Sequence, residues 1–245
     1  MKKWLLRILI LIVLIIIGLE IYTRFPSSAA LESLGLPAGT EYAVLLFHGS
    51  NGKDDPLMIA SSERIKQIIG ANSGVEVRYI VWSPWSDDRL RANINGRELA
   101  KSYGAELASL SDLTHLRLIA HSAGAYLLDP ICEVINQSDG SKPHIEMTFL
   151  DGMGIQGGWD YSYGYRHYGE CADFSLGIYS LDPVPGTNEP LDQSYNLDVT
   201  NDPTRSDIPS HLWPVEYFLN NLSVEEMTPG TRSHASLPRG ELATP

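Results

Sequence analysis

A serine within a run of small residues is the strongest candidate for chemistry in this chain of 245 residues. The apolar run Leu116–Ala120 predicts a buried strand, the tetrapeptide 121–124 (HSAG) follows it, and a segment typical of a helix comes next. Small residues permit a sharp turn between strand and helix, which exposes the serine hydroxyl. The pattern predicts that Ser122 is a nucleophile. The alternative is that Ser122 is only a small residue required by a tight turn.

A serine nucleophile needs partners, and histidine is the first of them. The hydroxyl is weakly nucleophilic near neutral pH, so an imidazole must take its proton and a carboxylate must orient that imidazole. His211 stands just before a predicted helix over residues 214–222, after the last predicted strand. We expect His211 to be the general base, with His167, in an aromatic loop, as its competitor.

Two aspartates are candidates for the carboxylate. Asp151 follows a predicted strand over residues 145–150, and Asp182 is reached at the end of the next predicted strand, which begins at Phe174. In an open α/β sheet, functional groups gather at the carboxyl ends of the strands, where both aspartates lie. We favour Asp151, because Asp182 is followed by proline and also fits the start of a plain turn. Asp182 remains the alternative acid.

The predicted elements alternate between strand and helix. Continuous apolar runs such as EYAVLLF (41–47) suit parallel strands that are covered on both faces. The pattern predicts an α/β fold with a mostly parallel central sheet of about six strands flanked by helices. The predicted strands span residues 41–47, 75–81, 116–120, 145–150, 174–181 and 195–200. The predicted helices include 56–69 and 90–110, the second with a stripe of Leu99, Tyr103, Leu107 and Leu110 that indicates core packing.

The first 24 residues differ in composition from the rest of the chain. Lys2, Lys3 and Arg7 precede the unbroken apolar run Ile8–Leu19, a pattern typical of a transmembrane helix or a signal segment. The absence of a small-x-small cleavage pattern directly after the run favours an uncleaved anchor over a secreted protein. The basic start places the following domain outside the cytoplasm, in the periplasm or the extracellular space.

These observations divide the chain into four parts. Residues 1–24 form the membrane anchor or signal segment, residues 25–40 a linker, and residues 41–222 the α/β domain. Residues 223–245, which are polar with scattered prolines, form a C-terminal arm or tail.

Net charge and cysteine content restrict the class of protein and the kinds of site that the chain can have. A formal net charge of −12 argues against a nucleic-acid-binding protein. Cys132 and Cys171 are the only two cysteines, and in an oxidising compartment they can form a disulfide or remain separate buried thiols. No CxxC or histidine-rich spacing indicates a metal site, so we predict neither a metal nor an organic cofactor.

At these residues the chain resembles a known family, the lipase-type α/β hydrolases, in the branch that includes the pancreatic-type lipases. The likeness covers about residues 41–222. It rests on LLFHG (45–49), the strand end at Trp82-Ser83, NINGRELAKSYGAELASL (93–110), IAHSAGA (119–125), FLDG (149–152) and HLWPVEYF (211–218).

The resemblance implies an α/β-hydrolase fold and a catalytic triad. It implies that Ser122 is the nucleophile, His211 the base and Asp151 the acid, in the chain order that this fold uses. Ala120 stands where most members of the family have glycine. The chain has no long lid insertion, so the resemblance does not imply interfacial activation.

By the same analogy, two backbone N–H groups bind the oxyanion of the tetrahedral intermediate. These are the N–H groups of Ala123, directly after the nucleophile, and of Ser50, in the loop after the first strand of the domain. His48, Gly49 and His121 are expected to frame the substrate-binding site.

An aromatic loop follows Asp151. The segment GMGIQGGWDYSYGYRHYGEC (152–171) is rich in glycine and tyrosine, and we expect it to overhang the site. Trp159 and Tyr163, together with Tyr161 and Tyr165, are candidates to line a substrate pocket in place of a lid. The alternative is a loop packed on the surface.

The sequence therefore predicts a serine hydrolase that cleaves carboxylic esters through an acyl-enzyme on Ser122. Its substrate is a small-molecule or lipid ester, and the N-terminal helix contacts the membrane. An acyltransferase or an amidase could use the same triad. A third alternative is a catalytically silent α/β-hydrolase domain that acts as an envelope binding module.

Overall fold

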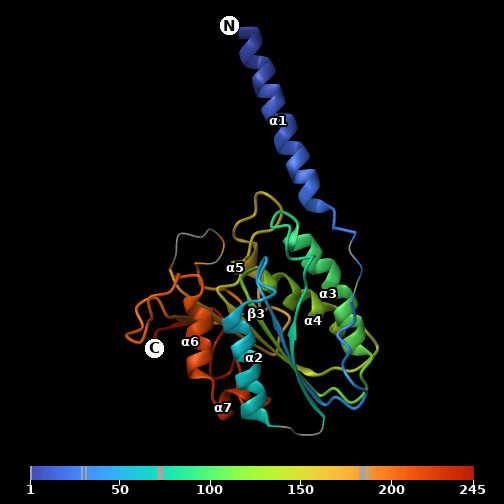
Figure 1. The fold of residues 1–245 in the computed structure, drawn as a ribbon, viewed down its shortest axis with the longest axis vertical. Coiled ribbons are helices and arrows are strands. Elements are labelled where there is room, and N and C mark those ends of the chain that lie inside the picture. Colours follow the sequence, from blue (N-terminus) through green and yellow to red (C-terminus); the bar gives the residue numbers. More distant parts are fainter. Residues whose placement is uncertain (1, 29, 31, 71–73, 182–185, 187) are drawn as a thin grey trace.

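The central feature of the molecule is a seven-stranded sheet with helices on both faces (Figure 1). The computed structural model describes residues 2–28, 30, 32–70, 74–181, 186 and 188–245. Neighbouring strands are all parallel, in the order β2-β1-β3-β4-β5-β6-β7. The strands are β1 (Tyr42–Phe47), β2 (Val75–Ile80), β3 (His115–His121), β4 (His144–Leu150), β5 (Phe174–Tyr179), β6 (Tyr195–Asp198) and β7 (Leu242–Ala243). The predicted parallel α/β sheet is confirmed.

Each central strand contributes to two hydrophobic cores, one on either face of the sheet. In β1, Leu45 and Phe47 pack into one core, whereas Val44 and Leu46 pack into the other, and all four are fully buried. Successive side chains of a strand point to opposite faces, so a strand covered on both sides is apolar along most of its length. This is the physical reason for the unbroken apolar runs in the sequence.

Two groups of helices cover the two faces (Figure 1). Helices α3 (Ala92–Ala108) and α4 (Ala125–Gln137) pack against each other on the first core. Three residues of the predicted stripe, Leu99, Tyr103 and Leu107, are buried there, whereas Leu110 follows the end of α3 and is only partly buried. Helices α2 (Pro56–Ile69), α6 (Trp213–Asn221) and α7 (Val224–Met227) lie on the second. At the carboxyl ends of the strands, the sheet is bordered by the loops that connect strands to helices.

Helix α1 (Lys2–Arg24) projects away from this edge of the domain (Figure 1). Within it, Lys3–Arg24 has a mean hydropathy of 2.7 over its most apolar window, none of which is buried in the protein. The helix is therefore long and apolar enough to cross a membrane, as the sequence predicted.

The C-terminal segment is ordered and adds the seventh strand, which the sequence analysis did not predict. Strand β7 has two residues and pairs with β6. The segment is also held by a buried ion cluster, in which Glu146 of β4 pairs with Arg117 of β3 and with Arg232 of the C-terminal segment, the latter at 3.0 Å. A two-residue strand has no periodicity of its own, so it could not be recognised locally.

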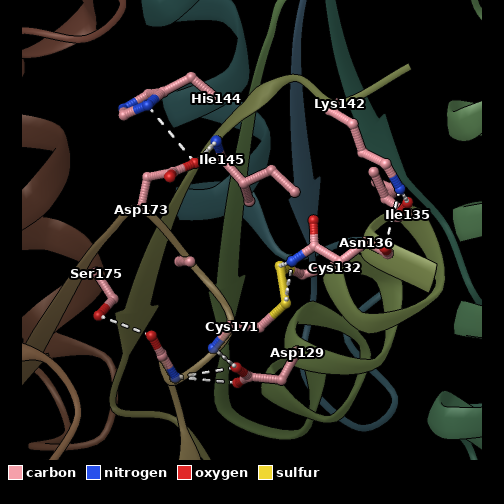
Figure 2. Close-up of a disulfide and its surroundings, with 12 residues drawn as sticks. Asp129, Cys132, Ile135, Asn136, Lys142, His144, Ile145, Cys171, Asp173 and Ser175 are labelled. Carbon is pink, nitrogen blue, oxygen red and sulfur yellow. Dashed lines mark hydrogen bonds and ion pairs between the residues drawn. A yellow bond between two sulfur atoms is a disulfide. The ribbon is translucent and has the colours of Figure 1, made fainter. Parts of the chain in front are cut away.

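A disulfide between Cys132 and Cys171 joins α4 to the segment before β5 (Figure 2). It closes a loop with a sequence separation of 39 residues. By loop-closure entropy, such a crosslink stabilises the fold by about 4 kcal/mol. Of the two possibilities that the sequence left open, a disulfide or two separate thiols, the structure has the disulfide.

Beside the disulfide lies a buried carboxylate, Asp129 (Figure 2). It accepts backbone hydrogen bonds from Gly169 at 3.0 Å and from Cys171 at 3.4 Å. Burial raises the pKa of Asp129 to about 7 despite these hydrogen bonds. The folded protein therefore retains a proton that the unfolded chain releases between about pH 4 and pH 7.

We expect Asp129→Asn to remove a pH dependence of stability. Stability contributed by this group is present below about pH 4 and is lost as the pH rises through 7. The free energy of unfolding of the variant, relative to that of the wild type, should rise by about 2 kcal/mol between pH 5 and pH 8, measured by urea unfolding. Asp112→Asn, which removes an exposed carboxylate in the turn before β3, should follow the wild-type profile. Equal profiles for wild type and Asp129→Asn would contradict the prediction.

Candidate active site

The register of the sheet brings the predicted nucleophile and acid to the same level. His121, the last residue of β3, pairs with Leu150, the last residue of β4. The next residues along the chain, Ser122 and Asp151, therefore leave the sheet side by side at its carboxyl edge. Both have a positive φ, 52° for Ser122 and 48° for Asp151. Such a conformation is uncommon for residues other than glycine and often marks a functional site.

The turn at Ser122 depends on close contacts that only small residues permit. A Cβ atom on Gly124 would lie 2.6 Å from the carbonyl oxygen of Phe47, and one on Gly49 would lie 2.9 Å from the Cβ of Ser122. Ala120 is fully buried before the turn, so its methyl group is accommodated there. Ser122 itself begins a short 3-10 turn, Ser122–Gly124, that leads into α4. This is the strand–turn–helix geometry expected of a nucleophile elbow.

His211 is held by the predicted acid. Its Nδ1 atom lies 2.6 Å from Oδ2 of Asp151, whose side chain is fully buried, whereas the side chain of His211 is 25% exposed. The other carboxylate oxygen, Oδ1, accepts a hydrogen bond from the backbone N–H of Ser180 at 3.2 Å. A carboxylate in this position fixes the orientation and tautomer of the imidazole.

The loop that carries His211 is fixed by residues that the sequence analysis did not identify. The hydroxyl of Ser180, at the end of β5, donates to the carbonyl oxygen of Ser210 at 2.7 Å. Arg205 donates to the carbonyl oxygen of Thr200 at 2.8 Å and to the hydroxyl of Ser210 at 2.7 Å. These side chains contact backbone and hydroxyl oxygens of a folded loop, so no motif in the sequence marks them.

His121 connects the elbow to two neighbouring segments. Its Nε2 lies 3.1 Å from the carbonyl oxygen of His211, and its Nδ1 lies 3.3 Å from the carboxylate of Asp55. Asp55 is also the N-cap of α2, directly before Pro56 at the start of the helix. Burial lowers the pKa of His121, although the Asp55 carboxylate acts in the opposite direction. Burial therefore favours the neutral ring. The two contacts indicate a positioning role for His121.

His48 fixes the loop after β1. Its Nδ1 donates to the carbonyl oxygen of Gly49 at 2.6 Å, and its Nε2 accepts from the backbone N–H of Trp82 at 3.2 Å. The Trp82 indole N–H in turn donates to the carbonyl oxygen of His48 at 2.7 Å. The ring is fully buried, and burial lowers the pKa of His48, so it remains neutral and suits this pair of hydrogen bonds.

One cavity of about 830 Å³ contains most of the predicted site. Residues predicted from the sequence that line it are Gly49, Ser50, His121, Ser122, Ala123, Tyr161 and His211. Its wall also includes Thr23, Leu90, Met153 and Ile155, which the sequence analysis did not assign to the site. This volume is typical of a pocket that binds a small molecule.

Two backbone N–H groups are available beside Ser122. The Ser50 N–H makes no hydrogen bond to another residue in the described part of the chain. Ala123 lies in the first turn of the 3-10 segment, where N–H groups have no partner within the helix. Both residues line the cavity, as an oxyanion-binding site would require.

Two predicted residues of the aromatic loop lie outside this cavity. Trp159 is 64% exposed and is not among the residues that line this cavity. Tyr163 lines a second cavity of about 470 Å³, which shares Asn93 and Tyr126 with the first. Asp182, the alternative acid, falls outside the residues that the structure describes.

The site offers acid–base and nucleophilic groups. In the described part of the chain, His, Cys, Asp and Glu side chains form no cluster of three or more that could hold a metal ion. Comparison of the chain with models of known protein families gave no match, and comparison with curated proteins gave none either.

Proposed function

We propose that the chain is a serine hydrolase of carboxylic esters with an α/β-hydrolase fold of the lipase type. The observation that carries this proposal is the arrangement of Ser122 and His211 at one cavity, with the buried Asp151 carboxylate bound to His211. Ser122 stands on a strand–helix turn with a φ of 52°, His211 lines the same cavity, and Asp151 holds Nδ1 of His211 at 2.6 Å. The sequence motifs of the lipase-type hydrolases support the same roles.

In the first half-reaction, the substrate acyl group is transferred to Ser122. His211 takes the hydroxyl proton at Nε2, since Nδ1 is directed at Asp151, while the serine oxygen bonds to the ester carbonyl carbon. The N–H groups of Ser50 and Ala123 stabilise the negative charge on the carbonyl oxygen. Protonated His211 then gives its proton to the departing alcohol as the ester C–O bond breaks.

In the second half-reaction, water releases the acyl group. His211 removes a proton from the water as its oxygen attacks the acyl carbon, and the proton is passed to Ser122 as the acid product leaves. An alcohol or amine acceptor would use the same residues, so the balance between hydrolysis and acyl transfer depends on which acceptor enters the cavity.

The N-terminal helix bears on the location of this reaction. Lys2, Lys3 and Arg7 precede or begin the apolar run of α1, a distribution that favours a cytoplasmic N-terminus. We propose that α1 is a membrane anchor and that the domain lies outside the cytoplasm. A disulfide between Cys132 and Cys171 fits an oxidising compartment.

Labelling with a fluorophosphonate tests the proposal directly. The probe reacts with serines that are activated as nucleophiles, so the full-length protein in detergent should be labelled on Ser122, identified by peptide mass spectrometry. Labelling should disappear in Ser122→Ala and fall strongly in His211→Ala. Ser109→Ala, at an exposed serine after α3, should leave labelling unchanged. A folded wild-type protein that takes no label would favour the silent binding module instead.

A further inference from the structure

The C-terminal end of α1 is attached to the loops around the active-site cavity. The Glu20 carboxylate accepts a hydrogen bond from the backbone N–H of Gly158 at 3.0 Å, and the Tyr22 hydroxyl donates to Asp88 at 2.5 Å. The guanidinium of Arg91 lies 3.8 Å from the centre of the Tyr22 ring, and its Nε donates to the Tyr22 carbonyl oxygen at 3.3 Å. These contacts tie the helix to the loops after β2 and β4.

The end of α1 also forms part of the cavity wall. Thr23 is only 9% exposed and lines the cavity together with Leu90 and Gly158. Figure 1 shows that α1 leaves the domain at the end where these loops lie. The C-terminal end of α1 therefore lies at the opening of the cavity, and the rest of the helix projects away from it.

Exposed apolar side chains gather around this mouth. Trp159 follows Gly158, Phe25 follows α1, and Leu90 and Tyr161 line the cavity while remaining more than half exposed. Such side chains are costly to leave in water when they lie close together, and they mark interaction sites. Val224, in α7 at the opposite end of the domain, provides an exposed apolar side chain for comparison (Figure 1).

The length of α1 indicates that a lipid bilayer covers these exposed apolar side chains. The candidate membrane span, the 22 residues Lys3–Arg24 with a charged residue at each end, is about 33 Å long at 1.5 Å per residue, close to the hydrocarbon thickness of about 30 Å. If α1 spans a bilayer, Glu20 to Phe25 lie at its surface, and the loops bonded to them lie there too. Tryptophan and tyrosine are enriched at such an interface.

We propose that α1 holds the mouth of the cavity against the membrane surface, so that the substrate is an acyl lipid ester that enters directly from the bilayer. Phe25, Leu90, Trp159 and Tyr161 form the membrane-contact surface of the domain. The ester group reaches Ser122 while the distal part of the acyl chain remains in the bilayer. The proposed contact between the cavity opening and the membrane is inferred from the contacts of α1 alone. The proposed lipid ester substrate also rests on the proposed hydrolase function.

A fluorophore at position 159 tests the placement without requiring activity. Since Cys132 and Cys171 are bonded to each other, a thiol introduced by Trp159→Cys can be labelled selectively. In the full-length protein in phosphatidylcholine vesicles, nitroxide-labelled lipid should quench this label at least twofold more than a label introduced by Val224→Cys. Equal quenching at the two positions would overturn the proposal.

The substrate class is tested with two esters of the same reporter. Full-length protein in phosphatidylcholine vesicles should hydrolyse membrane-embedded umbelliferyl oleate, and Phe25→Asp combined with Trp159→Asp should lower this rate at least tenfold. Hydrolysis of water-soluble umbelliferyl acetate should stay within twofold, and Val224→Asp should change neither rate. An equal loss on both esters, or no loss on the oleate, would overturn the proposal. Wild-type protein inactive on both esters but quenched at position 159 would contradict only the hydrolase function.

Discussion

Replacing Ser122 with alanine is expected to lower kcat for a water-soluble ester by a factor on the order of 10⁴ to 10⁶. The substitution removes the atom that forms the acyl-enzyme, while the backbone donors of Ser50 and Ala123 remain. His211→Ala should cost a similar factor, because without a base the Ser122 hydroxyl keeps its proton. Both rates are measured in detergent with enzyme of verified folding.

The double variant makes this prediction sharper. Nucleophile and base act as one unit, so Ser122→Ala with His211→Ala should be about as slow as either single variant. Additive losses would indicate that the two side chains work independently, which contradicts the proposed triad. A residual rate within tenfold of the wild type in Ser122→Ala would place the nucleophile elsewhere.

Replacing Asp151 with asparagine is expected to lower kcat by about 10⁴-fold. Asparagine retains the size of the side chain, but its amide cannot serve as the anionic acceptor at 2.6 Å from Nδ1 of His211. The imidazole then loses the group that fixes its tautomer and stabilises its charged form. The measurement is kcat on the same ester, with urea unfolding as a check on stability, since Asp151 is fully buried.

Asp182→Asn is the matched comparison, because Asp182 was the alternative acid in the sequence. We expect this variant to retain kcat within a few-fold of the wild type. A loss of about 10⁴-fold in Asp182→Asn with little change in Asp151→Asn would reverse the assignment of the acid.

Local patterns in the sequence were sufficient to predict the strands, turn and helices that form the site. The apolar runs predicted the parallel strands, because a strand buried on both faces is apolar along most of its length. The small residues around Ser122 predicted the sharp turn, and Gly124 shows why, since a Cβ there would collide with the backbone of β1. Periodicity also predicted the buried stripe of α3.

Contacts between distant segments could not be obtained in this way. Arg205 and Ser180 hold the loop of His211 through its backbone and hydroxyl oxygens, and Asp55, the N-cap of α2, also faces His121. Strand β7 is too short to carry a pattern. The aromatic loop was expected to line one pocket, yet Trp159 is exposed and Tyr163 lines a second cavity.

The sequence by itself determined the first six strands and their alternation with helices along the chain, the turn at Ser122 and the apolar character of α1. These depend on interactions between residues close together in the chain. The tertiary structure decided that Asp151 meets His211, that Cys132 bonds to Cys171 and that the end of α1 joins the cavity wall. Each of these depends on strand register and on loop conformations, which are set by the packing of both cores around the whole sheet.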